Sequence, residues 1–357
     1  MGTLGKRGPS TTVVGLHALL VLLAALALAA CGGSDATTAP SPSVEPSPVA
    51  ASPSVTPSET GTPLPTPTVA GTIAFTTLAG YMDNDICVVN TDGTGPKTLA
   101  GGEGCQQYPR WSPDGKKIVY YESAPGDQDP QHMWVMNADG SGKVQLTDIE
   151  YRNMFPSWSP DGKRIVFSHL VSYTGGVERD AIYVMNADGS GLRNVTSKKG
   201  PGVTSVDYWP TWEKDGTISF YRNGGSDGTT LSKFSVNPDG SGLTRLVKEA
   251  GSASDAWVKY QFGLSPDGKW VARHDVEADR LVIARVRGGG APVPLLDPVA
   301  AYARLSVEVA WSPDGKALAI AGQTETSFER LYIVNADGTG LSAVPGVDSA
   351  KDPAWRP

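Results

Sequence analysis

The sequence of 357 residues predicts an all-β fold, a six-bladed β-propeller with four-stranded blades. Two phrases that alternate along the chain carry this prediction, and an incomplete blade at each end of the repeat sets the number of blades. The first phrase, Trp-Ser-Pro-Asp-Gly or a close variant, occurs at Trp111–Gly115, Trp158–Gly162, Trp212–Gly216, Leu264–Gly268 and Trp311–Gly315. The second, Asn-x-Asp-Gly-Ser/Thr-Gly, occurs at Asn90–Gly95, Asn137–Gly142, Asn186–Gly191, Asn237–Gly242 and Asn335–Gly340.

The spacing and chemistry of the phrases assign them to turns. Successive first phrases, with Trp355 as the last tryptophan, begin 44 to 54 residues apart, which suits a four-stranded blade. Pro fixes φ, Asp hydrogen-bonds to its own backbone and Gly accepts positive φ, so Pro-Asp-Gly favours a tight turn between strands a and b. Asn-x-Asp-Gly is expected to join strands c and d. We expect each tryptophan to pack between neighbouring blades.

The two ends of the repeat complete each other. Thr72–Phe75 has the pattern of a strand b with no strand a before it, and Asp352–Trp355 that of a strand a with no strand b after it. Pairing of these segments would close the ring and leave no open sheet edge at the seam. The count is then six blades, with the C-terminal strand closing the first blade.

The alternation of the two phrases from residue 72 onward resembles the WD40-like propeller repeat of the TolB protein and of the propeller domains of some peptidases. TolB also has an N-terminal α/β domain, which we do not expect here. The fifth blade departs from the pattern, with Leu264 for Trp and Arg287–Gly290 in place of the Asp-Gly turn.

The N-terminus has the features of an export signal. Lys6 and Arg7 precede an apolar run, and Leu28-Ala29-Ala30-Cys31 resembles the lipobox of bacterial lipoproteins. That resemblance implies cleavage after residue 30 and a diacylglyceryl anchor on Cys31, which would meet the need for two acyl chains in stable anchoring. The alternative is a transmembrane helix, although the run is near the lower limit for spanning a bilayer.

The following segment, residues 31–71, is rich in Pro, Ser, Thr and Ala and is expected to be a disordered tether. The sequence thus predicts a signal peptide over 1–30, the lipidated tether over 31–71 and the propeller over 72–357. We expect the protein at the cell membrane, facing outside the cytoplasm in a periplasm or on a cell surface, as a monomer.

Charge and cysteine content limit the possible partners. Removing residues 1–30, which carry only Lys6 and Arg7 as charges, changes the net charge from −7 to about −9. An acidic chain without a basic run does not suit nucleic acid. Export favours a disulfide between Cys87 and Cys105, and two separate buried thiols are the alternative. We expect no metal and no cofactor, because two cysteines without a neighbouring histidine do not make a zinc site.

Candidate binding residues come from the blade face that carries the b–c and d–a loops, because these loops differ in every blade. Alignment of strand b places one residue per blade near this face: Thr77, Glu122, His169, Arg222, Asp275 and Gly322. His274 lies beside Asp275 and is a further candidate. Three positions before each tryptophan or its equivalent lies a second ring, half aromatic and half polar: Tyr108, Phe155, Trp209, Gln261, Glu308 and Asp352. Trp257 adds an aromatic side chain in a long loop. Solvated strand ends and core packing are the alternatives for the two rings.

Two functional hypotheses follow. The first is a lipid-anchored binding or scaffold propeller that recognises an envelope protein, a peptide or a glycan through the loop face. The second is a polysaccharide-active or other small-substrate enzyme, a lyase or hydrolase, with acid–base chemistry at Glu122, His169, Arg222 or Asp275. The segment Gly224–Gly228 matches Gly-x-Ser-x-Gly, but it has no predicted helix after it, as a nucleophile elbow requires. We therefore favour the binding hypothesis.

Overall fold

A computed structural model describes residues 69–77, 84–124, 130–174, 177–196, 206–223, 231–248, 263–275, 280–286, 291–295, 308–324 and 327–357. All of these belong to one compact unit, Gly61–Pro357. The predicted signal peptide, Cys31 and most of the predicted tether lie outside the described residues, as do Gln261 and Trp257. Within the described part of the chain, no helix is long and apolar enough to cross a membrane.

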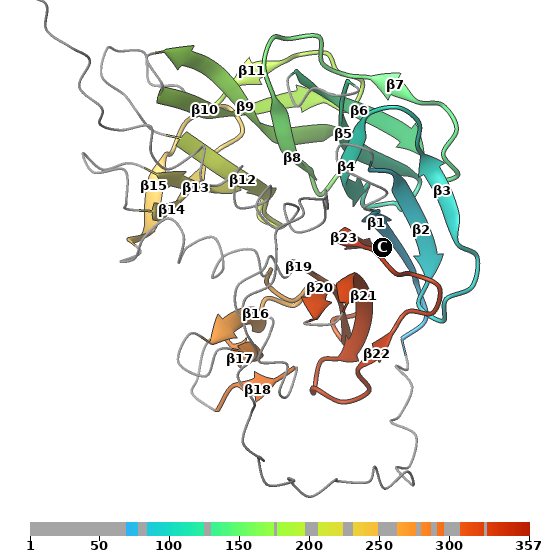
Figure 1. Cartoon of the computed structure of the whole chain (residues 1–357). Helices are drawn as coiled ribbons and strands as arrows, with labels where there is room; N and C mark the ends of the chain where they lie inside the picture. The colour runs from blue at the N-terminus through green and yellow to red at the C-terminus, as the bar shows by residue number, and fades with distance from the viewer. Residues whose placement is uncertain are drawn as a thin grey trace, which may run out of the picture. The chain divides into compact units, whose positions relative to one another are not determined.

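Six antiparallel sheets form the fold (Figure 1). In five of them the strands follow one another in the order of the chain, and the first sheet begins with the C-terminal strand. The first blade contains β23 (Lys351–Trp355), β1 (Thr72–Thr76), β2 (Ile86–Asn90) and β3 (Lys97–Ala100). The second contains β4 (Cys105–Trp111), β5 (Lys117–Ser123), β6 (Gln131–Asn137) and β7 (Val144–Gln145). The third contains β8 (Asn153–Trp158), β9 (Arg164–Thr174), β10 (Val177–Asn186) and β11 (Arg193–Asn194).

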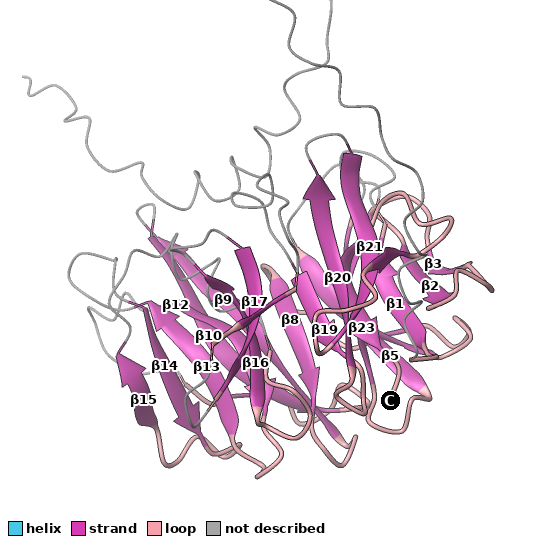
Figure 2. Cartoon of the chain, turned by 90° about the horizontal axis from the view of Figure 1, so that it is seen from below, coloured by secondary structure: helices cyan, strands magenta, loops and turns pink. Residues whose placement is uncertain are grey.

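The remaining three blades repeat this arrangement. The fourth contains β12 (Val206–Trp212), β13 (Ile218–Asn223), β14 (Leu231–Val236) and β15 (Thr244–Lys248). The fifth contains β16 (Trp270–Asp275), β17 (Arg280–Arg285) and β18 (Val293–Pro294), and a single bridge between Leu264 and Val271 marks the place of its strand a. The sixth contains β19 (Glu308–Trp311), β20 (Ala317–Thr324), β21 (Ser327–Asn335) and β22 (Ser342–Ala343). Figure 2 shows strands and loops and no helix among the residues described.

The first blade is built from both ends of the repeat, which confirms the predicted six-bladed propeller and its closure. Strand β23 pairs antiparallel with β1, with Trp355 opposite Ile73 and Ala354 opposite Ala74. Arg356 N donates to the carbonyl of Thr72 at 2.9 Å, which extends the pairing beyond the strand. The ring is therefore held closed by backbone hydrogen bonds between segments far apart in sequence.

Truncation of the chain after Ala350 is expected to abolish cooperative unfolding, because it removes the whole inner strand of the first blade. The lost strand also carries Trp355, which is buried against the sixth blade. Circular dichroism during heating measures the transition, with a chain lacking only the exposed Pro357 as the control. A truncated chain that melts like the control would contradict the role given to β23.

The repeated tryptophans join neighbouring blades through a shared hydrogen bond. The indole Nε1 of Trp158 donates to the carbonyl of Arg110 at 3.0 Å, and Arg110 immediately precedes the tryptophan of the previous blade. The same bond joins Trp111 to Ala354, Trp355 to Ala310 and Trp311 to Gly263. Burial of a large ring together with a satisfied N–H explains why the position favours Trp over an aliphatic residue.

The Asp-Gly turns satisfy their own polar groups. In the second blade, Ser112 Oγ donates to Asp114 Oδ1 at 2.6 Å, and the same carboxylate oxygen accepts from Lys116 N. Gly115 has φ of 64°, the left-handed conformation that glycine adopts without a steric penalty. Asp161, Asp267 and Asp314 repeat the serine bond in their blades. These aspartates stabilise the turns, as the turn chemistry predicts.

The predicted disulfide is not formed in the structure, where Cys87 and Cys105 are both buried. Successive residues of a strand face opposite sides of a sheet. Ile86 and Val88 pack toward the second blade, so Cys87 between them packs toward the sixth blade, and its Sγ lies 3.3 Å from Thr98 Oγ1. Cys105 begins β4 in the second blade, beside Asn84. The first sheet therefore lies between the two thiols.

Candidate functional site

The second predicted ring lies on the inner strands at a repeated β-bulge. Tyr108, Phe155, Trp209 and Asp352 all have positive φ, between 48° and 58°, and each precedes a proline. In β4, β8 and β12 the register with the next strand shifts at this position. Proline cannot donate to a ladder and is therefore found at bulges and edges. Glu308, which precedes Val309 and not proline, belongs to a regular ladder.

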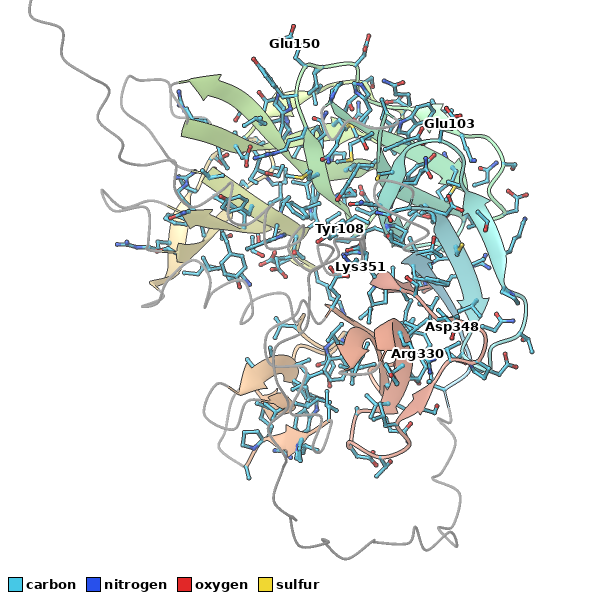
Figure 3. All side chains as sticks on the ribbon, in the orientation of Figure 1. Glu103, Tyr108, Glu150, Arg330, Asp348 and Lys351 are labelled. Atoms are coloured by element: carbon cyan, nitrogen blue, oxygen red, sulfur yellow. The ribbon has the colours of Figure 1, made fainter. Side chains whose placement is uncertain are left out.

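Side chains of three successive blades meet in an aromatic arc, defined here as Tyr108, Phe155 and Trp209. The ring centroids of Tyr108 and Phe155 are 5.0 Å apart in an edge-to-face pair, and those of Phe155 and Trp209 are 5.9 Å apart. Tyr121 stacks on Tyr108 at 5.5 Å, and its hydroxyl donates to Gln107 Oε1. Contacts at these separations are favourable for aromatic pairs. The arc is thus a continuous apolar surface around the inside of the ring, and Figure 3 shows Tyr108 near the middle of the molecule.

The sixth and first blades contribute an acid pair, Glu308 and Asp352, to the same ring. Glu308 Oε2 accepts a hydrogen bond from Asp352 N, and Thr76 Oγ1 donates to Asp352 Oδ2 at 3.0 Å. Burial, and then the charge of Asp352, raise the pKa of Glu308 well above its usual range. Burial followed by the two carboxylates also raises the pKa values of Tyr108 and Tyr121. The ring therefore has an acidic side and an aromatic side.

Two residues of the first predicted ring, Arg222 and His169, are held by neighbours on strand a. Arg222 makes a two-pronged salt bridge with Asp207, with Nε–Oδ1 at 2.6 Å and Nη2–Oδ2 at 2.7 Å, and both residues are buried. His169 Nδ1 lies 2.9 Å from Asn153 Oδ1. Glu122 lies opposite Gln106 and is partly buried, and this burial raises its pKa. In the second to fourth blades, these residues therefore lie opposite a polar residue of the neighbouring strand a.

His169 is buried beside Tyr183, and burial lowers its pKa from 6.5 to about 4. Because the folded pKa lies below the unfolded one, this group's contribution to stability is full above pH 6.5 and is lost as pH falls toward 4. We expect His169 to account for about 3 kcal/mol of the loss in unfolding free energy over that range. Urea unfolding at pH 7 and pH 4 measures it, with His169→Gln removing this share. An equal pH dependence in both proteins would contradict the assignment.

Other predicted site residues are not placed by the described side chains. For His274 and Asp275 only the backbone of β16 is described, opposite Leu281 and Arg280. Among the side chains that are described, no three His, Cys, Asp or Glu residues form a group suited to a metal ion. The described part of the site thus consists of the aromatic arc and the acid pair.

Sequence reasoning missed the partners of both rings. Asp207, Asn153 and Gln106 all lie two positions before a ring residue of strand a and directly opposite the strand-b residue that was predicted as a site. A polar residue at the same place in three blades was the available signal. Tyr121 and Arg110 were also missed as neighbours of the acid pair, and their effect on it appears only once the blades are packed.

The fold and the repeated tryptophan contacts between blades define the class of protein, a β-propeller built from the Trp-Ser-Pro-Asp-Gly repeat. A family model described as the TolB β-propeller domain matches residues 70–357, and the chain belongs to this family.

Solved structures agree with this fold. TolB from Acinetobacter baumannii is 21% identical with a TM-score of 0.60, over 80% of this chain and 67% of that one. A TolB homologue from Agrobacterium tumefaciens is 19% identical with a TM-score of 0.52, over 76% of this chain and 92% of that one. Kuenenia stuttgartiensis hydrazine synthase is 14% identical with a TM-score of 0.60, over 81% of this chain and 46% of that one. No curated protein matches the sequence. At these identities the similarity shows the fold alone.

Proposed function

We propose that the protein is an extracytoplasmic binding propeller, anchored by a lipid on Cys31, that recognises an envelope protein, a peptide or a glycan through its b–c and d–a loop face and the inner ring. The aromatic arc and the acid pair are the observation that carries this proposal. Equivalent positions of the repeat carry Tyr, Phe, Trp, Glu and Asp, whereas the turn positions repeat almost unchanged. Large aromatic side chains are enriched at binding surfaces.

The opposite face has less to offer a partner. At each described Asp-Gly turn, a Ser or Thr hydroxyl and a backbone N–H occupy the aspartate oxygen that faces them, as at Asp139 and Asp188. This bonding lowers the pKa of both carboxyl groups. Groups already bonded within a turn gain less from a partner than unbonded ones.

An enzymatic function has less support from the described residues. Arg222 is committed to Asp207, and His169 is buried against Asn153 and Tyr183. A catalytic acid or base has to reach the substrate within hydrogen-bonding distance. These two candidates therefore fit a structural role better than an acid–base one.

Crosslinking and affinity capture on intact cells test the proposal, with the full lipid-anchored chain as bait. We expect one dominant partner or wall glycan, and at least tenfold less capture with Trp209→Leu combined with Glu308→Gln. Lys163→Ala, an exposed change in an Asp-Gly turn, is the matched control. Equal capture by the ring variant and the control would refute this placement of the site.

The anchor is tested separately by Cys31→Ser. We expect this variant to leave the membrane fraction and to lose incorporation of labelled fatty acid, because diacylation is what holds the chain at the membrane. A Cys31→Ser chain that stays in the membrane fraction would favour the transmembrane alternative.

A further inference from the structure

The acid pair of the inner ring has more hydrogen-bond acceptors than the described residues around it satisfy. Asp352 is 3% exposed, and its Oδ1 has no hydrogen-bond partner among the residues that the structure describes. Its Oδ2 is bonded to Thr76. Glu308 accepts from the backbone of Asp352 through Oε2, and a side-chain hydrogen bond with Asp352 also helps to raise the pKa of Glu308. A buried acceptor without a donor costs about 1–3 kcal/mol, and more when it is charged. Such a group calls for a donor from outside the described chain, such as a water molecule, an ion or a ligand.

The nearby cation does not supply the missing donor. Arg110 Nη1 donates to the carbonyls of Pro109 at 2.9 Å and of Asp352 at 3.4 Å, and its guanidinium lies over the ring of Tyr108. Among the described side chains, no ion pair joins Arg110 to Glu308 or Asp352. Arg110 Nη1 is therefore bonded to backbone carbonyls, and among the described residues neither carboxyl group has an ion-pair partner.

Two rings of the aromatic arc, Phe155 and Trp209, belong to blades across the ring from the acid pair, whereas Tyr108 lies in the blade next to that of Asp352. In a six-bladed ring, the third blade is opposite the sixth and the fourth is opposite the first. Phe155 therefore belongs to the blade opposite Glu308, and Trp209 to the blade opposite Asp352. A group held between these sides would meet carboxylate oxygens on one side and ring carbons on the other.

We infer that the inner ring binds a cation that donates hydrogen bonds, a primary ammonium or guanidinium group on an apolar stem, as on the lysine, arginine or N-terminus of a peptide. Its N–H groups would satisfy Asp352 Oδ1 and the Glu308 carboxylate, in the strong class of charge-assisted hydrogen bonds. Its stem would pack on the aromatic arc, which also attracts positive charge. This inference rests on the proposed binding function and names the chemistry of the ligand. Burial and the neighbouring carboxylate of Asp352 raise the pKa of Glu308, and a bound cation would lower it.

Titration calorimetry on the purified full chain in detergent tests the inference with three probes of similar size. We expect n-butylammonium to bind. Tetramethylammonium should bind at least tenfold more weakly because it has no N–H group, and n-butanol should do so because it has no charge. The double variant Glu308→Gln, Asp352→Asn should weaken n-butylammonium at least tenfold. Its matched control is Glu103→Gln, Glu150→Gln, at exposed positions at the outer edge of the molecule (Figure 3).

Each opposite result overturns the inference. Equal binding of n-butanol would mean an apolar site, and equal binding of tetramethylammonium would mean an aromatic site that does not use the acceptors. Unchanged affinity in a double variant that melts like the wild type would remove the acid pair from the site. A partner captured from cells whose binding ignores the acid pair would refute the inference and leave the proposed function standing. Binding of n-butylammonium without any captured partner or glycan would support the inference and refute the proposed function.

Discussion

Replacing Trp158 by alanine is expected to lower the free energy of unfolding by about 3–5 kcal/mol, as for other large aromatic side chains removed from a core. Trp158 is buried between the second and third blades, against Val119, Phe167 and Met185. Its indole is also the donor to the carbonyl of Arg110, so the change leaves both a cavity and a carbonyl without its partner. The midpoint of thermal unfolding should fall by roughly 6–10 °C, at about 2 °C per kcal/mol for a domain of this size.

Trp158→Phe separates the two contributions. Phenylalanine keeps most of the apolar contact and loses the N–H, so its cost should be nearer to 1 kcal/mol, the typical net value of a hydrogen bond. Denaturant unfolding of both variants measures the difference. A loss below about 1 kcal/mol for the alanine variant would show that the stability of the fold does not depend on the packing and hydrogen bond of Trp158 between blades.

Asp207→Ala should be about as damaging, with a loss of about 3–5 kcal/mol, because it leaves the guanidinium of Arg222 buried without its counter-charge. The guanidinium carbon lies 5.3 Å from the ring centroid of Phe220 and 5.1 Å from that of Phe234. Neither ring can accept the hydrogen bonds that Asp207 now accepts. The penalty is therefore mainly the desolvation of an unpaired charge.

The double variant Asp207→Leu, Arg222→Met tests that cause. It removes both charges and fills the space with apolar side chains, so most of the lost stability should return. Urea unfolding of the single and double variants at one pH gives the comparison. If the double variant is as unstable as Asp207→Ala, the loss comes from packing and not from the charge. Recovery would identify the Arg222–Asp207 pair as a structural element, and ligand capture by the double variant would then show whether Arg222 also binds.

Much of the fold is predictable from the sequence because its determinants are local. The Asp-Gly turns need only the residues within them, as the bonds from Ser112 and Lys116 to Asp114 show. The spacing of the tryptophans measures one blade, and the incomplete ends of the repeat predict the pairing of β23 with β1. Blade number and closure therefore follow from the one-dimensional pattern.

The candidate site is less predictable, because it depends on which side chains meet across blades. Alignment placed Tyr108, Trp209, Glu308 and Asp352 in one ring, but it gave no reason to prefer this ring to the strand-b ring as a binding site. The structure shows that Arg222 and His169 are held by Asp207 and Asn153, residues that alignment did not consider. Likewise, export predicted a disulfide, whereas the alternation of residues along β2 turns Cys87 away from the second blade.

The sequence by itself determined the class of fold, the number of blades, the turns and the side chains that repeat between blades, since short-range turn chemistry and a regular period suffice for these. Only the tertiary structure decided which polar residues neutralise one another and which do not. Arg222 and Asp207 lie opposite each other on adjacent strands and form an ion pair. Glu308 and Asp352 come from different blades, and the described residues leave one of their acceptors unbonded. The physical reason is that hydrogen bonds and ion pairs act over a few ångströms, and that proximity is set by the packing of blades and not by separation along the chain.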